Sequence, residues 1–384
     1  MTPRGVAVLG STGSIGRQTL EVLAAHPELF ELRALAAGRG SDAFLAQVAS
    51  QPQARAWCPG GRPDTVGPGR WAEGGLEELA TLSGVDAVVV ATTGMIAVPA
   101  VLAALGAGRT VALANKETLV VAGHLVAAAL DVDGGDLLDR LRPIDSEHSA
   151  IWQCLRGEQA SDVRRLILTA SGGPFRGRAP ASLDVATPAE ALAHPTWKMG
   201  PKITIDSATL VNKAFEQIEA RWLYRLPYPK IDAVIHPESV VHSLVEFVDG
   251  SYKAQLGVPD MRLPIQYALS HPDRHPSPAQ SLGPEAWGSL HFEAFDPDDY
   301  PAFRATRAAA VEGGNRGAIL NAADEVAVAA FLAGAIPFTS IARTLEQAVE
   351  RWGSDGEPDL AGIRALDDEV RAALSAELGL GGAL

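Results

Sequence analysis

The sequence predicts an α/β protein. A doubly wound, parallel-sheet dinucleotide-binding domain comes first, followed by an α+β domain and a small C-terminal helical domain. Short apolar runs alternate with Ala- and Leu-rich segments at the start, a glycine-rich turn follows the first run, and helical spacing dominates after residue 300. Because 384 residues is long for one domain, we place domains at 1–150, 151–275 and 301–384, with a linker at 276–300.

The composition narrows the classes of function. Apolar residues make up 47% of the chain and charged residues 20%, as in a globular protein with a real core. The formal net charge of −14 argues against general nucleic-acid binding, which needs basic patches. A local site can still be cationic, so a small phosphorylated ligand remains open, and a metal ion is readily accommodated.

Neither a disulfide framework nor a membrane segment is expected. Cys58 and Cys154 are the only cysteines, and their spacing is not that of a zinc site. No run approaches the roughly 20 apolar residues of a membrane span. Met1 leads almost directly into the strand-like run Gly5–Leu9, which leaves no room for a cleavable leader. We therefore expect a cytoplasmic protein that binds neither membrane nor nucleic acid.

The strands of the first domain are expected in four continuous apolar runs, the pattern of a parallel sheet buried on both faces. They are Gly5–Leu9, Leu32–Ala36, Asp86–Ala91 and Thr110–Leu113. Segments such as Thr19–Ala25 and Val98–Leu105 supply the crossing helices. In this architecture ligands bind at the carboxyl ends of the strands.

The elements of the later domains follow from the same patterns. Strands are expected at Val163–Thr169, Ala233–Ile235, Ser243–Val248 and Tyr252–Leu256. Helices are expected at Ala208–Tyr224, Met261–Leu269, Ala318–Leu332 and Ile341–Trp352. A Pro- and Ser-rich stretch from His271 to Gly288 indicates a linker. The chain shows no internal repeat.

A glycine-rich segment, GSTGSIG at 10–16, follows the first strand and opens a helix. The free N–H groups and positive dipole end of a helix N-terminus suit a pyrophosphate. The spacing GxxGxxG is one residue longer than the usual fingerprint, and a plain strand-to-helix turn is the competing interpretation. The context favours a dinucleotide held by Thr12, Gly13, Ser14 and Ile15.

The end of the second strand discriminates between cofactors. An NAD enzyme typically places an acid there for the ribose hydroxyls, whereas this chain has Gly38, Arg39, Gly40 and Ser41. Arginine and serine could hold a 2′-phosphate through charge-assisted and hydroxyl hydrogen bonds. The alternative is a solvated turn. The sequence favours NADP over NAD.

Two carboxylates, Asp145 and Glu147, fall in a segment expected to be extended before a helix at Ala150–Leu155. Residues two apart in an extended chain point the same way. Carboxylates held together suit a hard divalent cation. An N-cap followed by a first-turn acid explains the same residues equally well.

A second acidic segment begins at Asp206 and is expected to be a strand end leading into a helix. Asn212, Lys213 and Glu216 share one side of that helix at spacings of three and four. Ser207 would lie near the helix start, where hydroxyl, amide and ammonium groups together resemble a phosphate cradle. A solvated helical ion pair is the alternative, but it does not explain Ser207 and Asn212.

Three further stretches carry polar groups in suggestive places. Ser171 and two glycines form a turn after a strand, which suits a phosphate or is simply structural. The loop 194–201 carries Trp197 and Met199 between two prolines. It is predicted to be an active-site lid, and an ordinary packed loop is the alternative. Lys116 follows a strand of the first sheet, where it could stabilise negative charge on an oxygen. His236 and His242 are left without a role.

Taken in order, these motifs resemble 1-deoxy-D-xylulose 5-phosphate reductoisomerases. The matching stretches are GSTGSIG at 10–16, ANKE at 114–117, PIDSEHSAIWQCL at 143–155, ASGGPF at 170–175, HPTWKMGPKITIDSATLVNKAFE at 194–216, IHPESVVHS at 235–243 and LNAADEVAVAAFL at 320–332. The resemblance covers about residues 10 to 330, which makes it far more specific than any single motif.

The resemblance implies a role for each matching position. The metal ligands would be Asp145, Glu147 and Glu216, holding Mg²⁺, Mn²⁺ or Co²⁺. The substrate would be bound by Lys116, Ser146, Glu147, Ser171, His194, Ser207, Asn212, Lys213 and Glu216. NADPH would be bound by Thr12, Gly13, Ser14, Ile15, Gly38, Arg39, Gly40, Asn115, Glu117 and Gly200. Lys116, Glu147 and Glu216 would be the catalytic residues.

The implied reaction rearranges 1-deoxy-D-xylulose 5-phosphate and reduces the product with NADPH to 2-C-methyl-D-erythritol 4-phosphate, a precursor of isoprenoids. Family members are homodimers of three domains, the middle one catalytic and dimerising. This chain departs from the family at Arg39 and Gly40 (usually Lys and Asn), Lys198, Ala214 (usually Gly) and Asp324 (usually Asn). These departures put cofactor affinity and lid kinetics in doubt, not the chemistry.

Two other functions fit part of the pattern. A simple NADP-dependent sugar or semialdehyde dehydrogenase needs no cluster of three carboxylates, and neither Cys58 nor Cys154 lies in a setting that suits an acylating nucleophile. A non-catalytic NADP-binding sensor would tolerate loss of the acids. Activity that survives EDTA would favour the simple dehydrogenase. Cofactor binding without metal-dependent substrate binding would favour the non-catalytic sensor.

Overall fold

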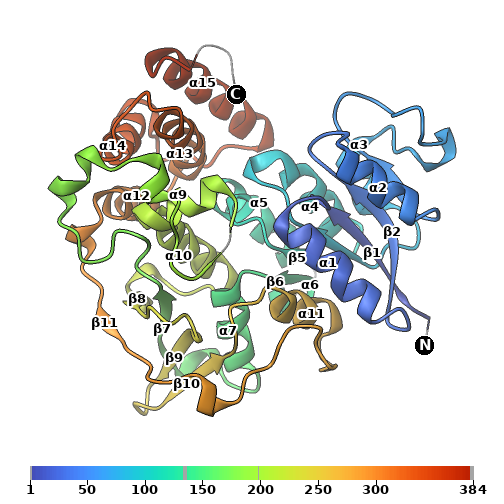
Figure 1. Cartoon of the computed structure of the whole chain (residues 1–384), viewed down its shortest axis with the longest axis horizontal. Helices are drawn as coiled ribbons and strands as arrows, with labels where there is room; N and C mark the ends of the chain where they lie inside the picture. The colour runs from blue at the N-terminus through green and yellow to red at the C-terminus, as the bar shows by residue number, and fades with distance from the viewer. Residues whose placement is uncertain (1, 133–135, 198, 381–384) are drawn as a thin grey trace. The chain divides into compact units, whose positions relative to one another are not determined.

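The computed structural model describes residues 2–132, 136–197 and 199–380 of the chain. They fall into two compact units (Figure 1). The first unit contains the residues up to 118, together with 125–152 and 260–281. The second contains 119–124, 153–259 and the residues from 282 onward. Each unit is built around its own β-sheet.

The sheet of the first unit has six strands, all parallel, in the order β3-β2-β1-β4-β5-β6. They are β1 (Arg4–Leu9), β2 (Phe30–Ala36), β3 (Arg55–Trp57), β4 (Ala87–Val90), β5 (Thr110–Leu113) and β6 (Leu141–Pro143). This doubly wound order confirms the predicted fold class. The four expected strands are present, whereas β3 and β6 are too short to stand out as apolar runs. The strand order reverses between β1 and β4, where ligands bind in such sheets.

Helices surround this sheet and bury its strands. They are α1 (Ser14–Ala25), α2 (Asp42–Ser50), α3 (Gly75–Thr81), α4 (Val98–Gly106), α6 (Leu137–Arg140) and α7 (Ser146–Leu155). The side chains of Val6, Val8 and Leu9 in β1 are fully buried, which is why these strands are apolar without alternation. Each such side chain contributes roughly 1.5–3 kcal/mol by leaving water.

The chain returns to the first unit late, through helix α11 (Arg262–Ser270). Ile265 and Leu269 of this helix are buried. Arg142 from β6 donates a hydrogen bond of 2.9 Å to the carbonyl oxygen of Ala268. The sequence pattern predicts the helix but assigns it to the 151–275 segment, because periodicity does not say which sheet an apolar face will cover.

The sheet of the second unit is mixed, in the order β10-β9-β7-β8-β11. Its strands are β7 (Val163–Ala170), β8 (Ile231–Ile235), β9 (Val241–Phe247), β10 (Tyr252–Leu256) and β11 (Glu293–Ala294). Strands β7 and β8 are parallel, and the other pairs are antiparallel. The four expected strands are present. The short edge strand β11 comes from the segment expected to be only a linker.

Within the described residues, the second unit also contains three α-helices between β7 and β8 and four after β11. They are α8 (Pro188–Ala191), α9 (Pro201–Thr209), α10 (Val211–Leu223), α12 (Pro301–Glu312), α13 (Arg316–Leu332), α14 (Ser340–Trp352) and α15 (Leu360–Glu377). The last four confirm the expected helical C-terminal region. The expectation of a strand end at Asp206 and one helix from Ala208 is wrong. Asp206 lies inside α9, and Leu210, with φ of 56°, separates α9 from α10.

Helix α5 (Glu117–Asp131) belongs to both units, because residues 119–124 pack in the second. A Cβ at Gly123 would lie 2.2 Å from Nε1 of Trp222 in α10. A Cβ at Gly317 in α13 would lie 2.0 Å from the carbonyl oxygen of Val120. The two glycines therefore let neighbouring helices approach this part of α5 closely. No helix in the described ranges is long and apolar enough to cross a membrane.

Candidate active site

The glycine-rich turn of the first unit connects β1 to α1 at the point where the strand order reverses. Gly10 has φ of 95°, and a Cβ there would lie 2.3 Å from the carbonyl oxygen of Ala91 in the loop after β4. A Cβ at Gly16 would lie 2.2 Å from the carbonyl oxygen of Gly10. Helix α1 has Gly13 as N-cap and no side-chain capping bond. The turn is therefore packed tightly against β4 and presents backbone N–H groups suited to a diphosphate.

A glutamine that the sequence interpretation missed holds this turn. The Nε2 amide of Gln47 in α2 donates 3.0 Å to the carbonyl oxygen of Ser11, and the buried Ser11 hydroxyl contacts Gln47 Oε1 at 2.7 Å. One glutamine on a surface helix carries no pattern that would predict this role.

The loop after β2 is exposed at Gly38, Arg39 and Gly40. Ser41 is engaged locally, because its hydroxyl accepts a hydrogen bond from the backbone N–H of Phe44 and caps α2. A Cβ at Gly40 would lie 3.4 Å from the sulfur of Cys58, an ordinary contact. This position is therefore not restricted to glycine, and the guanidinium of Arg39 is the group available for a phosphate.

Asn115 uses the full hydrogen-bonding capacity of its side chain inside the first unit. Its amide donates to the carbonyl oxygens of Thr92 (3.0 Å) and Gly94 (2.9 Å). Its oxygen accepts from the backbone N–H and the hydroxyl of Thr118, at 2.8 and 2.6 Å. An asparagine has two donors and two lone pairs, so this 1% exposed side chain ties the loop after β4 to the start of α5.

Lys116 and Glu117 lie at the start of α5, just beyond the end of β5, and both are buried. The ammonium of Lys116 lies 2.9 Å from a carboxylate oxygen of Asp145, and the two side chains are only 8% and 11% exposed. Asp145 follows β6, the next strand of the sheet. The carboxyl ends of β5 and β6 thus bring a cation and an anion together, as the sheet topology predicts.

Asp145 and Glu147 lie at the start of α7, not in an extended segment. The backbone N–H of Ser149 donates 2.8 Å to the carbonyl oxygen of Asp145, and Glu147 is in the first helical turn. The expectation of an extended chain here is wrong, because the helix begins four residues earlier than predicted. The carboxylates still converge, with one oxygen of each within 4.8 Å of the other. The Ser146 hydroxyl donates to Glu147 Oε2 at 2.5 Å.

Asp145 is held in its ionised form. Burial opposes ionisation, but the charges of Lys116 and His148 hold the pKa of this carboxyl well below its usual range. A ring nitrogen of the fully buried His148 lies within 4.8 Å of an Asp145 oxygen. The sequence pattern assigned no role to this histidine, although it directly follows Glu147 and lies one helical turn beyond Asp145.

In the second unit, His194 joins two serines that are far apart in the chain. Its Nε2 lies 3.1 Å from the hydroxyl of Ser171, after β7, and 3.1 Å from the hydroxyl of Ser207, in the last turn of α9. A Cβ at Gly173 would lie 2.5 Å from the carbonyl oxygen of Ser207, so glycine permits this approach. The expectation that Ser207 lies at a helix start is wrong.

The hydrogen bonds of His194 fix its tautomer. Its Nδ1 accepts from the backbone N–H groups of Thr196 (3.1 Å) and Trp197 (2.9 Å). The ring proton is therefore on Nε2 and is donated toward the serine oxygens, which leaves the serine protons for an outside acceptor such as a phosphate oxygen. Burial lowers the pKa of His194 below 6.5, which favours this neutral ring.

Asn212, Lys213 and Glu216 converge on the first turns of α10. Glu216 accepts from the amide of Asn212 at 2.6 Å and forms an ion pair with the ammonium of Lys213. Lys213 also donates 2.6 Å to the carbonyl oxygen of Thr169 at the end of β7. The side chains of Lys213 and Glu216 are 3% and 1% exposed. The alternative of a solvated surface pair is therefore wrong.

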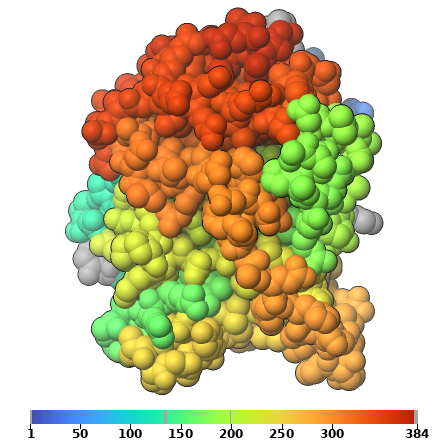
Figure 2. Space-filling model, turned by 90° about the vertical axis from the view of Figure 1, so that its left-hand side faces the viewer, coloured from blue at the N-terminus to red at the C-terminus, as the bar shows by residue number. Residues whose placement is uncertain are grey.

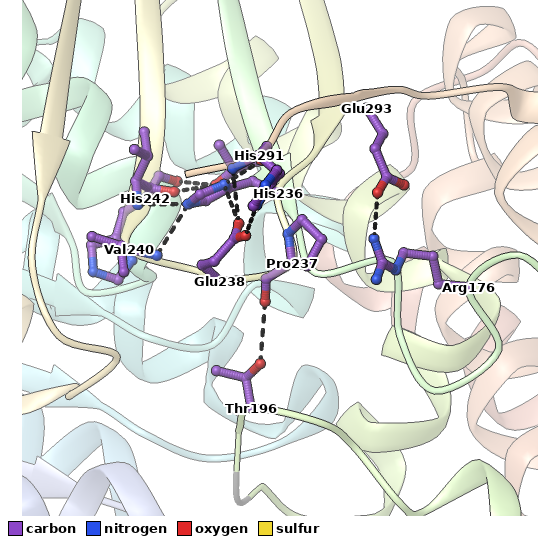
Figure 3. Close-up of polar contacts among 11 residues, drawn as sticks. Arg176, Thr196, His236, Pro237, Glu238, Val240, His242, His291 and Glu293 are labelled. Atoms are coloured by element: carbon purple, nitrogen blue, oxygen red, sulfur yellow. Dashed lines mark hydrogen bonds and ion pairs between the residues drawn. The ribbon is translucent and has the colours of Figure 1, made fainter. Parts of the chain in front are cut away.

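The expected lid loop follows His194 and ends where Gly200 caps α9. Thr196 donates from its hydroxyl to the carbonyl oxygen of Pro237 at 3.4 Å (Figure 3). The ring of Trp197 lies 6.4 Å from that of His242, centroid to centroid. Lys198 is outside the described residues. The loop is thus anchored at Thr196, between His194 and α9.

The departure at Asp324 falls in a buried ionic cluster behind α9. The ammonium of Lys202 lies 2.6 Å from an oxygen of Asp324 in α13 and 2.6 Å from an oxygen of Asp206. Asp324 is fully buried and Asp206 is 2% exposed. The cluster ties α9, which carries Ser207, to the C-terminal helices. An aspartate at 324 strengthens the charge facing Lys202 without touching a proposed ligand.

Family models match the described parts of both units. A model described as 1-deoxy-D-xylulose 5-phosphate reductoisomerase matches residues 6–57 and 69–123. Its C-terminal domain model matches 141–224, and a further DXP reductoisomerase C-terminal domain model matches 256–373. Together these matches extend through most of the chain.

Whole proteins give the same result. The chain is 48% identical to 1-deoxy-D-xylulose 5-phosphate reductoisomerase of Geobacillus kaustophilus over 380 residues, covering 96% of this chain and 97% of the relative. It is 46% identical to that of Bacillus subtilis, covering 96% and 98%. The Zymomonas mobilis enzyme, solved with NADPH, is similar with a TM-score of 0.87 and 39% identity, covering 98% and 99%. A DOX-P reductoisomerase solved with NADPH, fosmidomycin and magnesium gives 0.87 and 38%, covering 98% of each chain.

Proposed function

The chain belongs to the 1-deoxy-D-xylulose 5-phosphate reductoisomerase family, and from this premise we propose how its own residues carry out the family's reaction. The protein is an oxidoreductase that converts 1-deoxy-D-xylulose 5-phosphate to 2-C-methyl-D-erythritol 4-phosphate with NADPH and a divalent metal. The reaction belongs to isoprenoid precursor synthesis.

NADPH fits the turn between β1 and α1. Gly10 and Gly16 leave no room for a side chain, and the N-terminus of α1 lacks a side-chain cap. These features support a diphosphate at Thr12, Gly13, Ser14 and Ile15. Gly38, Arg39 and Gly40 would hold the 2′-phosphate through the exposed guanidinium. Asn115, Glu117 and Gly200 remain proposed cofactor contacts, and Asn115 would act through its backbone because its side chain is saturated.

The acids Asp145, Glu147 and Glu216 would hold the metal. Carboxylate oxygens are the donors that Mg²⁺ and Mn²⁺ prefer, and Co²⁺ accepts them too. Two observations support the assignment within the units: the Asp145 and Glu147 oxygens converge at the end of the first sheet, and Glu216 is a buried carboxylate oriented by Asn212 and Lys213. When bound, the ion supplies Lewis-acid polarisation of a substrate oxygen and NADPH supplies hydride.

The substrate phosphate would be bound by Ser171, Ser207, Asn212 and Lys213, with His194 behind the two serines. The neutral His194 donates to the serine oxygens and so orients their hydroxyl protons outward. The phosphate would bind away from the reacting carbons. The free energy of this binding would help to close the loop that carries Trp197 and Met199. Closure would exclude water from the reacting carbons.

The remaining polar residues would act on the substrate backbone. Lys116 would stabilise negative charge developing on a substrate oxygen, and its ion pair with Asp145 fixes the ammonium in place. Ser146 and Glu147 would meet the substrate hydroxyls. The acid pair and Lys116 lie at the ends of β5 and β6, which is where this type of sheet binds ligands.

We further propose a cytoplasmic homodimer with domains at 1–150, 151–275 and 301–384. NADPH and sugar phosphates are intracellular metabolites, which supports the compartment. Strand β10 is an edge of the second sheet, and Tyr252 and the nearby Val248 are 52% and 64% exposed. Exposed edges and apolar side chains of this kind suit pairing with a second copy. Light scattering of the purified protein would report the oligomeric state.

The buried Lys213–Glu216 pair, with Asn212 and Thr169 as its partners, is the structural observation that most favours a metal-dependent enzyme over a cofactor-binding sensor. The test mixes purified protein, 1-deoxy-D-xylulose 5-phosphate, NADPH and Mg²⁺, and follows nicotinamide absorbance with identification of the product. We expect oxidation of NADPH, the branched polyol phosphate as product, and loss of activity in EDTA. Oxidation that survives EDTA would instead indicate a simple dehydrogenase.

A further inference from the structure

A short part of the expected linker, residues 291–293, is held against the second unit by a network centred on His236. We call these three residues the strap. Strand β11 begins within it, at Glu293, and pairs with Ile235 at the end of β8. Figure 2 shows the orange segment that leads to the C-terminal helices at the surface of the molecule. The strap therefore has a defined place and does not merely connect domains.

His236 contacts the strap and the turn before β9 through both ring nitrogens (Figure 3). Its Nε2 accepts from the backbone N–H groups of Val240 (3.2 Å) and Val241 (3.1 Å). The ring proton is therefore on Nδ1, which lies 2.8 Å from the carbonyl oxygen of His291 and must donate to it. The ring is fully buried and stacks on Phe292, with centroids 4.7 Å apart.

Glu238 contacts both His236 and His291 of this network. Its carboxylate accepts from the backbone N–H of His291 at 3.2 Å and lies 2.5 Å from Nδ1 of the same residue. It also lies 3.1 Å from Nδ1 of His236. Partial burial acts to raise the pKa of Glu238, but the hydrogen bonds from His291 hold it below its usual range. An ionised Glu238 thus fixes the strap by accepting hydrogen bonds.

Two contacts connect this network to the proposed phosphate-binding residues. Glu293 of the strap forms an ion pair of 2.6 Å with Arg176, in the segment that follows β7 and contains Ser171. Pro237, next to His236, accepts the hydroxyl hydrogen bond of Thr196 in the loop after His194. Arg176 lies five residues after Ser171 in the chain, and Thr196 lies two residues after His194. None of these residues has a role in the reaction as proposed.

We propose that His236 is a positioning residue for the phosphate end of the substrate. Together with Glu238 it holds the strap, and the strap and the adjacent turn hold the Ser171–Arg176 turn and the lid loop in their binding geometry. The proposal rests on the proposed function of Ser171, His194 and Ser207. It predicts that loosening the strap weakens binding of the sugar phosphate and leaves NADPH binding unchanged.

The chain offers a matched control for the strap ion pair. Arg351 and Glu377 form an exposed pair with the same 2.6 Å separation, between α14 and α15 of the same unit. The side chains of Arg176 and Glu293 are 40% and 52% exposed, and those of Arg351 and Glu377 are 54% and 51% exposed. Glu293→Gln and Glu377→Gln therefore remove equivalent surface pairs, only one of which belongs to the strap.

The experiment measures KM for 1-deoxy-D-xylulose 5-phosphate, KM for NADPH, kcat and melting temperature for each variant. We expect Glu293→Gln to raise the sugar-phosphate KM by about two- to fivefold, with kcat and the NADPH KM unchanged, and Glu377→Gln to change none of them. His236→Ala should raise the same KM by about tenfold or more, because three backbone groups lose their partner. The reversed pair Arg176→Glu with Glu293→Arg should recover most of the affinity that either single change loses.

Equal KM values for Glu293→Gln and Glu377→Gln would overturn the proposal, as would parallel rises in both KM values with a lower melting temperature. Should His236→Ala fail to fold, the comparison of Glu293→Gln with Glu377→Gln still tests whether the strap affects sugar-phosphate binding. Binding of inorganic phosphate by titration calorimetry, compared between the same two variants, provides a readout independent of turnover. A wild-type protein that does not turn over the substrate would count against the proposed function alone.

Discussion

The two units build their proposed binding residues by different means. In the first unit the proposed dinucleotide turn is made of backbone, because Gly10 and Gly16 leave no room for a side chain and the N-terminus of α1 has no side-chain cap. In the second unit the proposed phosphate-binding residues are side chains from different segments, and His194 contacts two of them, Ser171 and Ser207. A backbone site is defined by a few consecutive residues, whereas a side-chain site depends on how distant segments pack. The proposed dinucleotide turn and the proposed phosphate-binding residues should therefore respond differently to substitution.

The largest effect is expected in the second unit, from Glu216→Gln. This change keeps the size of the side chain but removes a carboxylate that we assign to the metal, so turnover should fall by roughly a thousandfold. NADPH affinity should stay the same, because the dinucleotide turn is in the other unit. Steady-state kinetics and fluorescence titration of NADPH provide the two measurements.

Folding must be checked in this variant, since Lys213 would lose its buried partner charge and breaking such a pair costs about 3–5 kcal/mol. A melting curve taken with the kinetic data separates the two effects. Undiminished turnover in a folded Glu216→Gln protein would remove this residue from the site.

The next largest effect should come from Gly10→Ala in the first unit. Its Cβ would lie 2.3 Å from the carbonyl oxygen of Ala91, and φ of 95° is unfavourable for alanine. We expect a loss of about 1–3 kcal/mol in the free energy of unfolding and at least about tenfold weaker NADPH binding. The matched change Gly13→Ala, where the nearest atom lies 3.4 Å from the added Cβ, should keep stability within about 0.5 kcal/mol. Equal stability losses at both positions would contradict the backbone explanation.

A smaller effect tests whether Asn115 acts on the ligands or on the fold around them. Asn115→Ala leaves the carbonyl oxygens of Thr92 and Gly94 without their donor, which should lower kcat/KM for the sugar phosphate by about tenfold. Thr118→Val removes only the hydroxyl donor to the Asn115 oxygen and should reproduce part of this loss.

The double variant separates the two roles of Asn115. If Asn115 acts by tying the two loops together, the two losses should not add, because both changes break one network. Fully additive losses, with the larger one in NADPH affinity, would show that the Asn115 side chain binds the cofactor directly.

The smallest effect concerns pH and His194. Its pKa in the folded protein is lowered from 6.5 by burial, so the unfolded chain binds a proton at a higher pH than the folded one. The free energy of unfolding should therefore be unaffected above pH 6.5 and fall as the pH drops below it, by less than about 1 kcal/mol per pH unit for this half-buried ring.

The same protonation places a proton on Nδ1, against the N–H groups of Thr196 and Trp197, so KM for the sugar phosphate should rise over the same pH range. Denaturant melts and KM values at several pH values, with His194→Gln as the comparison, provide the test. An identical pH dependence in His194→Gln would assign it to another group.

The sequence by itself determined whatever depends on neighbouring residues. The apolar runs predicted the four longer strands of the first sheet, the glycine spacing predicted the tight turn between β1 and α1, and the ordered motifs indicated the family. The sequence pattern was wrong about two helix boundaries. Helix α7 begins at Ser146, earlier than predicted, and Asp206 lies inside α9, where a strand end was expected. These errors arose because the first residue of a helix and a helix break such as that at Leu210 are not visible in periodicity alone.

Only the tertiary structure decided which groups are buried and which partners they meet. The spacing of Lys213 and Glu216 is equally compatible with a solvated pair, and it is the packing of α10 against β7 that buries them. The same holds for the saturation of Asn115, the return of α11 to the first unit and the strap beside His236. Backbone preferences act over a few residues, whereas burial and hydrogen-bond partners are set by segments that lie far apart in the chain.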